Sequence, residues 1–126
     1  MAELGKRERN RLERQEALKG AGLELFLRRG IEPVTIDELA KASGMAKGNF
    51  YRYFTDKGAL VEAILVPIAS EVRTVIRRCA IGVGRAQNTA ELTAAYAMMA
   101  LELARIGVSE SRTVQLYLQE LSLIHI

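Results

Sequence analysis

Residues 47–53, which follow a glycine-containing turn, combine the side chains with the clearest chemical use. If this segment is a helix with its apolar side turned inward, its other face carries two cations, an amide, two phenol hydroxyls and a glycine. Such groups can hold phosphates and pair with base edges, and a glycine lets the backbone approach closely. The pattern predicts binding to the groove of a nucleic acid, although a plainly solvated helix face has the same composition. The residues concerned are Lys47, Gly48, Asn49, Tyr51, Arg52 and Tyr53.

Residues 35–54 have the spacing of a helix-turn-helix, the element that would present this face. Thr35 and Glu38 form the pattern of a capping box, in which each side chain accepts a hydrogen bond from the other residue's backbone N–H. Ala40 is small where two helices would cross, and Gly44 can adopt the left-handed conformation that the turn requires. We therefore expect a short helix after Thr35 and a turn at Gly44.

The second helix of the pair is expected over residues 47–54. Ala46, Phe50 and Phe54 recur every four residues, so they would face inward and hold the helix against the rest of the domain. This register turns Gly48 and Arg52 outward. The sequence therefore separates an anchoring side from a polar side on the same short helix.

The rest of the chain is also helical in pattern, and no segment alternates as a strand would. An apolar stripe precedes the motif and ends at Gly30. Asp56 can cap a long helix that contains Pro67, which should kink or split it. A break is expected over residues 81–88, with further helices after it. The predicted fold is all-α.

Composition removes several classes of function. The chain has 126 residues, of which 49% are hydrophobic and 26% charged, and its net charge is +3. One cysteine, Cys79, excludes an internal disulfide and a multi-cysteine zinc site. One histidine, His125, lies at the end, so we expect no enzyme, metal or cofactor. The uncharged apolar run 94–101 is too short for a membrane span of about 20 residues. A cytoplasmic protein without a membrane segment is expected.

Residues 12–65 resemble the N-terminal DNA-binding domain of TetR/AcrR-type transcriptional regulators. The resemblance is carried by LELFLRRG and by TIDELAKASGMAKGNFYRYFTDKGALVEAIL. It implies that the third helix enters the major groove of double-stranded operator DNA, in a bacterial protein associated with the nucleoid. It further implies a homodimer when full length, and a repressor released from its operator by a small-molecule effector that binds a C-terminal helical domain.

Site residues also follow from this resemblance. It implies phosphate contacts from Thr35, Tyr51, Tyr53 and Lys57. It implies base or groove contacts from Lys47, Gly48 and Asn49, while Arg52 joins them on helix geometry alone. Ala46 departs from the family pattern, in which serine or threonine commonly caps the helix, at a cost of about 1 kcal/mol.

The expected layout has four parts. Residues 1–11 form a basic flexible arm, which either follows the phosphate backbone or is only a solvated end. A three-helix DNA-binding domain spans 12–72, and the first helices of an effector-binding and dimerisation domain span 73–120. Compared with the family's C-terminal domain, this second domain is expected to be truncated at its C-terminal end. Residues 121–126, LSLIHI, match the translation of a sequencing adapter, so an artefact is expected there, the alternative being a genuine amphipathic terminus.

Two interpretations stay open beyond this. Tyr96, Met99 and Tyr117 could line an effector pocket, since methionine and tyrosine adapt to varied ligands, or they could form a plain core. The chain could also be a helical protein-interaction module that keeps the scaffold without sequence-specific DNA binding.

Overall fold

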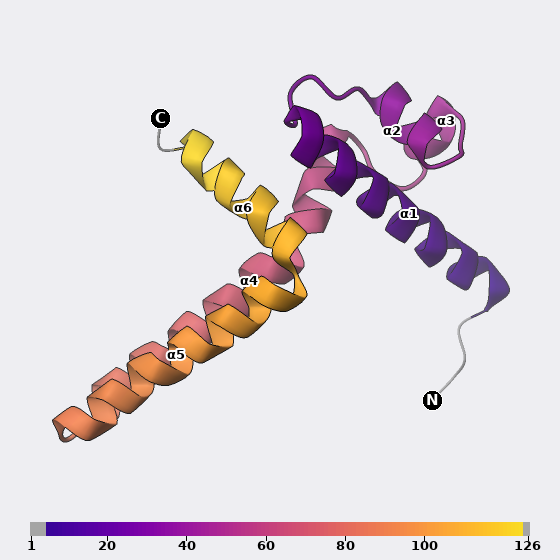
Figure 1. The fold of residues 1–126 in the computed structure, drawn as a ribbon. Helices are drawn as coiled ribbons and strands as arrows, with labels where there is room; N and C mark the ends of the chain where they lie inside the picture. Colours follow the sequence, from indigo (N-terminus) through magenta and orange to yellow (C-terminus); the bar gives the residue numbers. More distant parts are fainter. Residues whose placement is uncertain (1–4, 125–126) are drawn as a thin grey trace. The chain divides into compact units, whose positions relative to one another are not determined.

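The computed structural model describes residues 5–124, with side chains described for residues 5–120. Throughout residues 5–124 the regular structure is helical, which confirms the all-α prediction (Figure 1). The chain divides into two compact units, residues 1–64 and 65–126, and each unit is described by itself. The helices are α1 (Lys6–Arg29), α2 (Ile36–Ala42), α3 (Lys47–Phe50), α4 (Lys57–Arg85), α5 (Thr89–Ser109) and α6 (Ser111–Ile124).

The first unit packs α1, α2, α3 and the first turns of α4 around an apolar core. Leu18 and Phe26 of α1 and Phe50 of α3 have no exposed surface. Gly22 lies between those two α1 residues, and a Cβ there would meet the Leu60 side chain at 3.0 Å. A larger residue here would therefore have to displace the Leu60 side chain, because α1 and α4 pack closely at this point.

The turns of the first unit form as the sequence predicts. Gly30 ends α1 at φ 82° and donates its N–H to the carbonyl of Phe26, at 2.8 Å. Thr35 begins α2 with a complete capping box, since its hydroxyl accepts from the N–H of Glu38 at 3.1 Å. Gly44 has φ 73°, the left-handed conformation that the turn was expected to require.

Two local expectations for the first unit are wrong. The helix expected over residues 47–54 ends at Phe50, because the hydrogen bonds of the next residues close three-residue turns, such as Tyr53 N–H to Phe50 at 2.9 Å. Ala46 is exposed rather than inward. Its backbone is extended (φ −75°, ψ 152°), so it precedes the helix and does not share its register.

The basic N-terminal segment also differs from the expected arm. Because α1 begins at Lys6, residues 6–11 belong to its first turns. These residues continue the helical register of the apolar stripe, and an ion pair from Arg11 to Glu8, at 3.3 Å, joins neighbouring turns. Residues 1–4 lie outside the described part of the chain.

The second unit contains most of α4 together with α5 and α6. Pro67 lies inside α4, which is not split and continues to Arg85, so the break expected over residues 81–88 is limited to the residues after Arg85. Asn88 then caps α5, accepting from the N–H of Glu91 at 2.9 Å. The adapter-derived end expected over residues 121–126 lies outside the described side chains, although α6 is drawn to Ile124.

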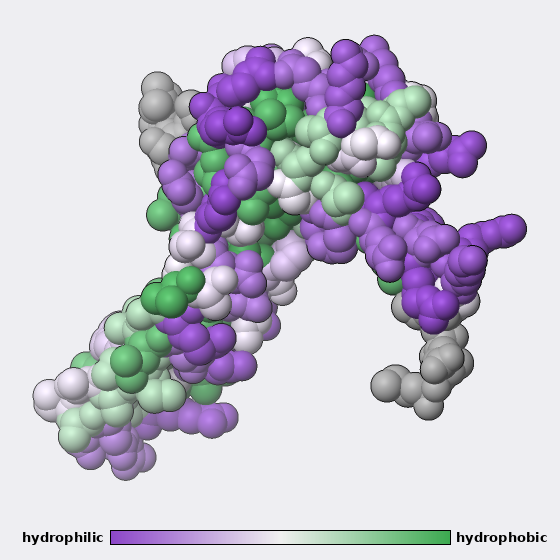
Figure 2. Space-filling view, turned by 45° about the vertical axis from the view of Figure 1, so that its right-hand side comes forward, coloured by the Kyte–Doolittle hydropathy of each residue, from purple (hydrophilic) through white to green (hydrophobic). Residues whose placement is uncertain are grey.

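A small cluster holds the second unit together. Ile68 and Val75 of α4 are buried against Ile106 of α5. Partly buried side chains surround this cluster: Val72, Met99, Leu103 and Val114. Beyond it many large apolar side chains remain exposed, and Figure 2 shows hydrophobic surface over α4 and α5. The cluster therefore uses only part of the apolar surface that these helices carry.

By length and composition alone, α5 is apolar enough to cross a membrane. The uninterrupted apolar run 94–101 does not reveal this property, because α5 is 21 residues long and its charges are scattered. One helix of this kind is weak evidence for a membrane protein, since core helices of soluble proteins have the same length and composition.

Candidate nucleic-acid interface

The polar side of α3 and of the turn after it faces away from the core. Lys47, Gly48 and Arg52 are exposed, and Tyr51 keeps half of its surface accessible. Asn49 and Tyr53 are half-buried. These six residues are therefore accessible, in full or in part, to a ligand of the first unit.

Phe50 is the anchor of this surface. Its side chain is fully buried. Its ring packs edge-on against Tyr51 at 5.6 Å and lies tilted against Phe54 at 6.0 Å between ring centroids. Because the neighbours of Phe50 on both sides are polar and accessible, burying this one ring fixes the direction in which they point.

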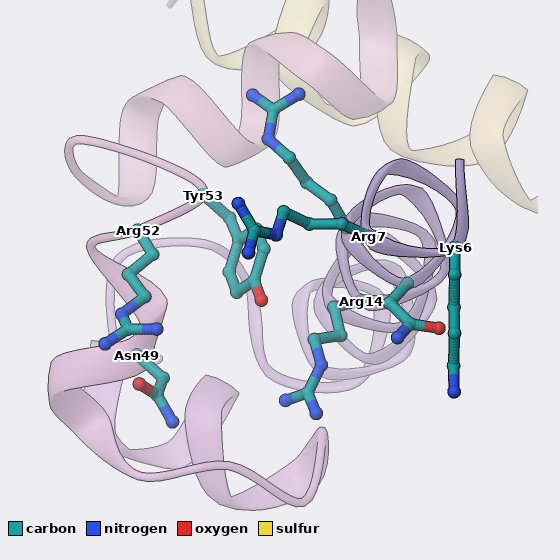
Figure 3. Close-up of a pocket in the computed structure, with 8 residues that line it drawn as sticks. Lys6, Arg7, Arg14, Asn49, Arg52 and Tyr53 are labelled. Carbon is teal, nitrogen blue, oxygen red and sulfur yellow. The ribbon is translucent and has the colours of Figure 1, made fainter. Parts of the chain in front are cut away.

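A groove of about 760 Å³ lies between the first turns of α1 and the segment that contains α3 (Figure 3). Figure 3 shows the labelled side chains of both segments around this groove. Asn49, Arg52 and Tyr53 contribute from one side. The α1 residues are Lys6, Arg7, Asn10, Arg11 and Arg14.

The groove is strongly electropositive. Five of its lining residues carry a positive charge and none is acidic. Among them, Arg11 forms an ion pair with Glu8, whereas no ion pair within residues 5–120 involves Arg7, Arg14 or Arg52. Like charges held together repel one another, so the groove attracts anions.

Thr35 and Lys57 have other partners in the structure. The Lys57 ammonium group donates to the backbone carbonyls of Ile31, Glu32 and Val34 at 2.9, 2.9 and 3.0 Å. These bonds use all three of its donors and hold the loop that leads into α2. The Thr35 hydroxyl donates to Glu38 Oε1 at 3.1 Å within the capping box. Both residues therefore position the helix-turn-helix.

Glu38 also links α2 to the end of α1. Its carboxylate accepts from the Arg29 guanidinium as well as from Thr35. The hydrogen bond from Arg29, with a smaller contribution from Thr35, lowers the pKa of Glu38 below its ordinary value. Glu38 thus ties the capping box to α1, on which the basic side of the groove lies.

The α1 side of this site was not predicted. The basic N-terminal residues were expected to form an arm, whereas they lie on α1 and line the groove beside α3. The signal was present in the spacing of Arg7, Arg11 and Arg14, which repeats at i, i+4 and i+7 in register with the apolar stripe. Extending the helix to this segment would have put the three arginines on one face.

The residues suggested for an effector pocket differ in their burial. Met99 packs against the cluster of the second unit and lines a cavity of about 240 Å³, whose lining includes neither Tyr96 nor Tyr117. Tyr96 is 50% exposed. A pocket formed by all three residues therefore stays a prediction. Within residues 5–124, no three His, Cys, Asp or Glu side chains group as metal ligands.

Comparison with known proteins finds sequences similar to the first unit. Residues 20–64 match the family described as bacterial regulatory proteins, tetR family. The HTH-type transcriptional regulator YvdT of Bacillus subtilis is 37% identical over 49 residues, which cover 39% of this chain and 25% of YvdT. Transcriptional regulator AcuR of Cereibacter sphaeroides is 42% identical over 52 residues, which cover 38% of this chain and 24% of AcuR.

A solved structure has the same fold over a longer stretch. It is a TetR family transcription regulator from Marinobacter aquaeolei, with a TM-score of 0.55 and 21% identity, and the match covers 87% of this chain and 54% of that one. The chain thus spans about a quarter of the curated relatives that it matches and about half of the solved one. The first unit therefore contains a helix-turn-helix domain similar to that of the tetR family of bacterial regulatory proteins.

Proposed function

We propose that this chain binds double-stranded operator DNA through the exposed side of α3 and acts as a transcriptional repressor. One observation carries the proposal: α3 is anchored by the fully buried Phe50 while Lys47, Gly48 and Arg52 remain accessible. A rigid short helix with a polar, cationic outer side fits the major groove, whose base edges are read by amide and guanidinium groups.

The side chains divide by chemistry. Asn49 and Arg52 can form paired hydrogen bonds with base edges, which is how sequence is read. Lys47, Tyr51 and Tyr53 suit phosphate contacts, which fix the register of the protein on the duplex. Thr35 and Lys57 act indirectly, because their donors already bond within the protein.

Regulation would require two copies. In a homodimer, the two α3 helices would enter half-sites about 34–36 Å apart, or one helical turn of DNA. A small-molecule effector would release the operator by binding better to a form with a different spacing. The protein would then act in the bacterial cytoplasm, on the nucleoid, with no catalytic role, metal or cofactor.

Gly48 provides the sharpest test of this proposal. A Cβ at Gly48 would meet no atom of the protein within 4 Å, so Gly48→Ala costs the fold nothing. On DNA the added methyl group would lie where the backbone must come close. We expect at least a tenfold loss of operator affinity at unchanged thermal stability, measured by fluorescence anisotropy with a labelled duplex.

Gly20→Ala is the matched control, since Gly20 also lies in a helix with nothing within 4 Å of the added Cβ, but on α1. It should leave operator affinity unchanged. Equal effects of the two substitutions, or no effect from either, would show that α3 is not part of the DNA interface.

The second candidate function is a helical protein-interaction module. The exposed apolar side chains of the second unit favour it, because large exposed patches mark interaction sites. A regulator prefers its site over random duplex and loses affinity steeply with salt, whereas an interaction module does neither.

A further inference from the structure

We propose that the groove between the first turns of α1 and α3 holds the sugar–phosphate backbone of the duplex, so that α1 is a second DNA-contacting element. The inference rests on the proposed function, since the backbone concerned belongs to the DNA that α3 enters. It adds a contact made by the α1 turns that precede the stretch matched by the family, which begins at residue 20.

The spacing of the α1 arginines fits a DNA strand. Arg7, Arg11 and Arg14 lie at i, i+4 and i+7, so they share one side of the helix and line the groove. At about 1.5 Å of rise per residue, Arg7 and Arg14 are separated by about 10 Å along the axis. One DNA strand carries a phosphate about every 3.4 Å of its axis, so this distance covers about three phosphates.

Most charges of the groove have no ion-pair partner among the described side chains. Arg7, Arg14 and Arg52 form no ion pair within residues 5–120, and the Arg11–Glu8 pair is about half exposed at both side chains. Gathering cations in one groove costs electrostatic free energy in the free protein. A polyanion would recover that free energy on binding.

The position of the groove favours the DNA backbone over a small anion. Asn49, Arg52 and Tyr53 line the groove and also belong to the segment proposed to enter the major groove. A phosphodiester strand that borders the major groove would therefore pass directly into it. The volume of about 760 Å³ also exceeds what a single phosphate fills.

The test removes charge from the α1 side alone. In Arg7→Gln/Arg14→Gln, both altered side chains are exposed, so thermal stability should not change. The slope of log affinity against log salt should become shallower by about 0.9 for each lost phosphate contact, or about 1.8 per bound copy. If affinities converge at 1 M salt, binding at 0.1 M falls about 60-fold per copy. Operator and random duplex should lose affinity alike.

Two further variants separate phosphate contact from other effects. Arg7→Lys/Arg14→Lys keeps the charges and should restore most of the salt slope. Arg73→Gln/Arg77→Gln removes the same charge from exposed positions of α4 and should leave the slope unchanged.

The outcomes distinguish the two proposals. If the wild-type chain prefers its operator but Arg7→Gln/Arg14→Gln keeps the wild-type slope, the groove does not hold the backbone and the proposed function stands. A fall in affinity at an unchanged slope would also overturn the inference. If the wild-type chain shows no preference for any duplex sequence, the proposed function fails and this inference fails with it.

Discussion

The two units of the chain bury their apolar side chains to very different extents. In the first unit, Leu18, Phe26, Leu39, Phe50 and Leu60 have no exposed surface, and only Leu12 and Tyr51 stand out as exposed large apolar residues among its described positions. The second unit exposes many more. They are Val66, Ile76, Ile81, Leu92, Tyr96, Met98, Leu101, Val108 and Leu118.

This difference separates two kinds of surface along the sequence. The first unit closes its own core and presents charge, which suits a polyanionic partner. The second unit buries Ile68, Val75 and Ile106 but leaves apolar surface on the outside. Soluble monomers rarely expose large contiguous apolar patches. That surface is therefore suited to contact with another protein surface. Recognition of DNA and association with protein are thus expected to depend on different units.

The largest expected effect contrasts one core residue with one exposed residue. Phe50→Ala should lower the free energy of unfolding by about 3–5 kcal/mol, because it leaves a cavity in the first unit. Leu101→Ala, at a position that is 67% exposed in the second unit, should change it by no more than about 0.5 kcal/mol. Urea unfolding followed by circular dichroism measures both. Similar losses from the two substitutions would contradict the contrast in burial.

The next largest effect on stability is expected from substitutions at two glycines. Gly44→Ala places a side chain at φ 73° and should cost about 1–2 kcal/mol. Gly107→Ala lies inside α5 with nothing within 4 Å of the new Cβ, so it should stabilise by up to about 1 kcal/mol. Opposite shifts in melting temperature are expected. An unchanged or raised melting temperature for Gly44→Ala would show that the turn at Gly44 does not require the left-handed conformation.

Acidification provides a smaller test, confined to the first unit. The pKa of Glu38 is lowered in the folded state, chiefly by the hydrogen bond from Arg29. Its contribution to stability is therefore complete above the ordinary glutamate pKa of about 4.3 and is lost as the pH falls through the lower folded value. Glu38→Gln should destabilise at neutral pH, and its difference from wild type should shrink below about pH 4. A difference that stays constant with pH would show that the ionised Glu38 carboxylate does not stabilise the first unit.

The smallest effect on stability is expected from Leu101→Gln/Val108→Gln. Both side chains are mostly exposed, so the free energy of unfolding should change by less than about 0.5 kcal/mol. Self-association, measured by light scattering over a range of concentrations, should fall. Unchanged association would show that this apolar surface is not used between copies of the chain.

The sequence was most informative where local chemistry decides the structure. Thr35 with Glu38, Gly30 and Gly44 fix caps and turns through their own backbones, and the structure confirms all of them. Phe50 was also correctly placed inward. Ala46 was not, because its inward placement assumed a helix that had not yet begun.

Features that depend on tertiary partners could not be predicted in the same way. Lys57 was expected at a phosphate, and only the folded chain brings three carbonyls to its ammonium group. The groove joins residues about forty positions apart, so the spacing of the α1 arginines predicts their common face but not the residues opposite. The effector pocket stays a prediction for the same reason, since Tyr96 and Met99 lie close in sequence but differ in burial.

The account depends most directly on α3 reading bases. Selection of bound sequences from a pool of random duplexes, carried out with wild type and with Asn49→Ala, measures this. The account predicts a preferred sequence for wild type, and for Asn49→Ala a changed preference at the one or two base pairs that the amide contacts, at a cost of about 1–3 kcal/mol. The same preferred sequence from both proteins, or none from wild type, would contradict it.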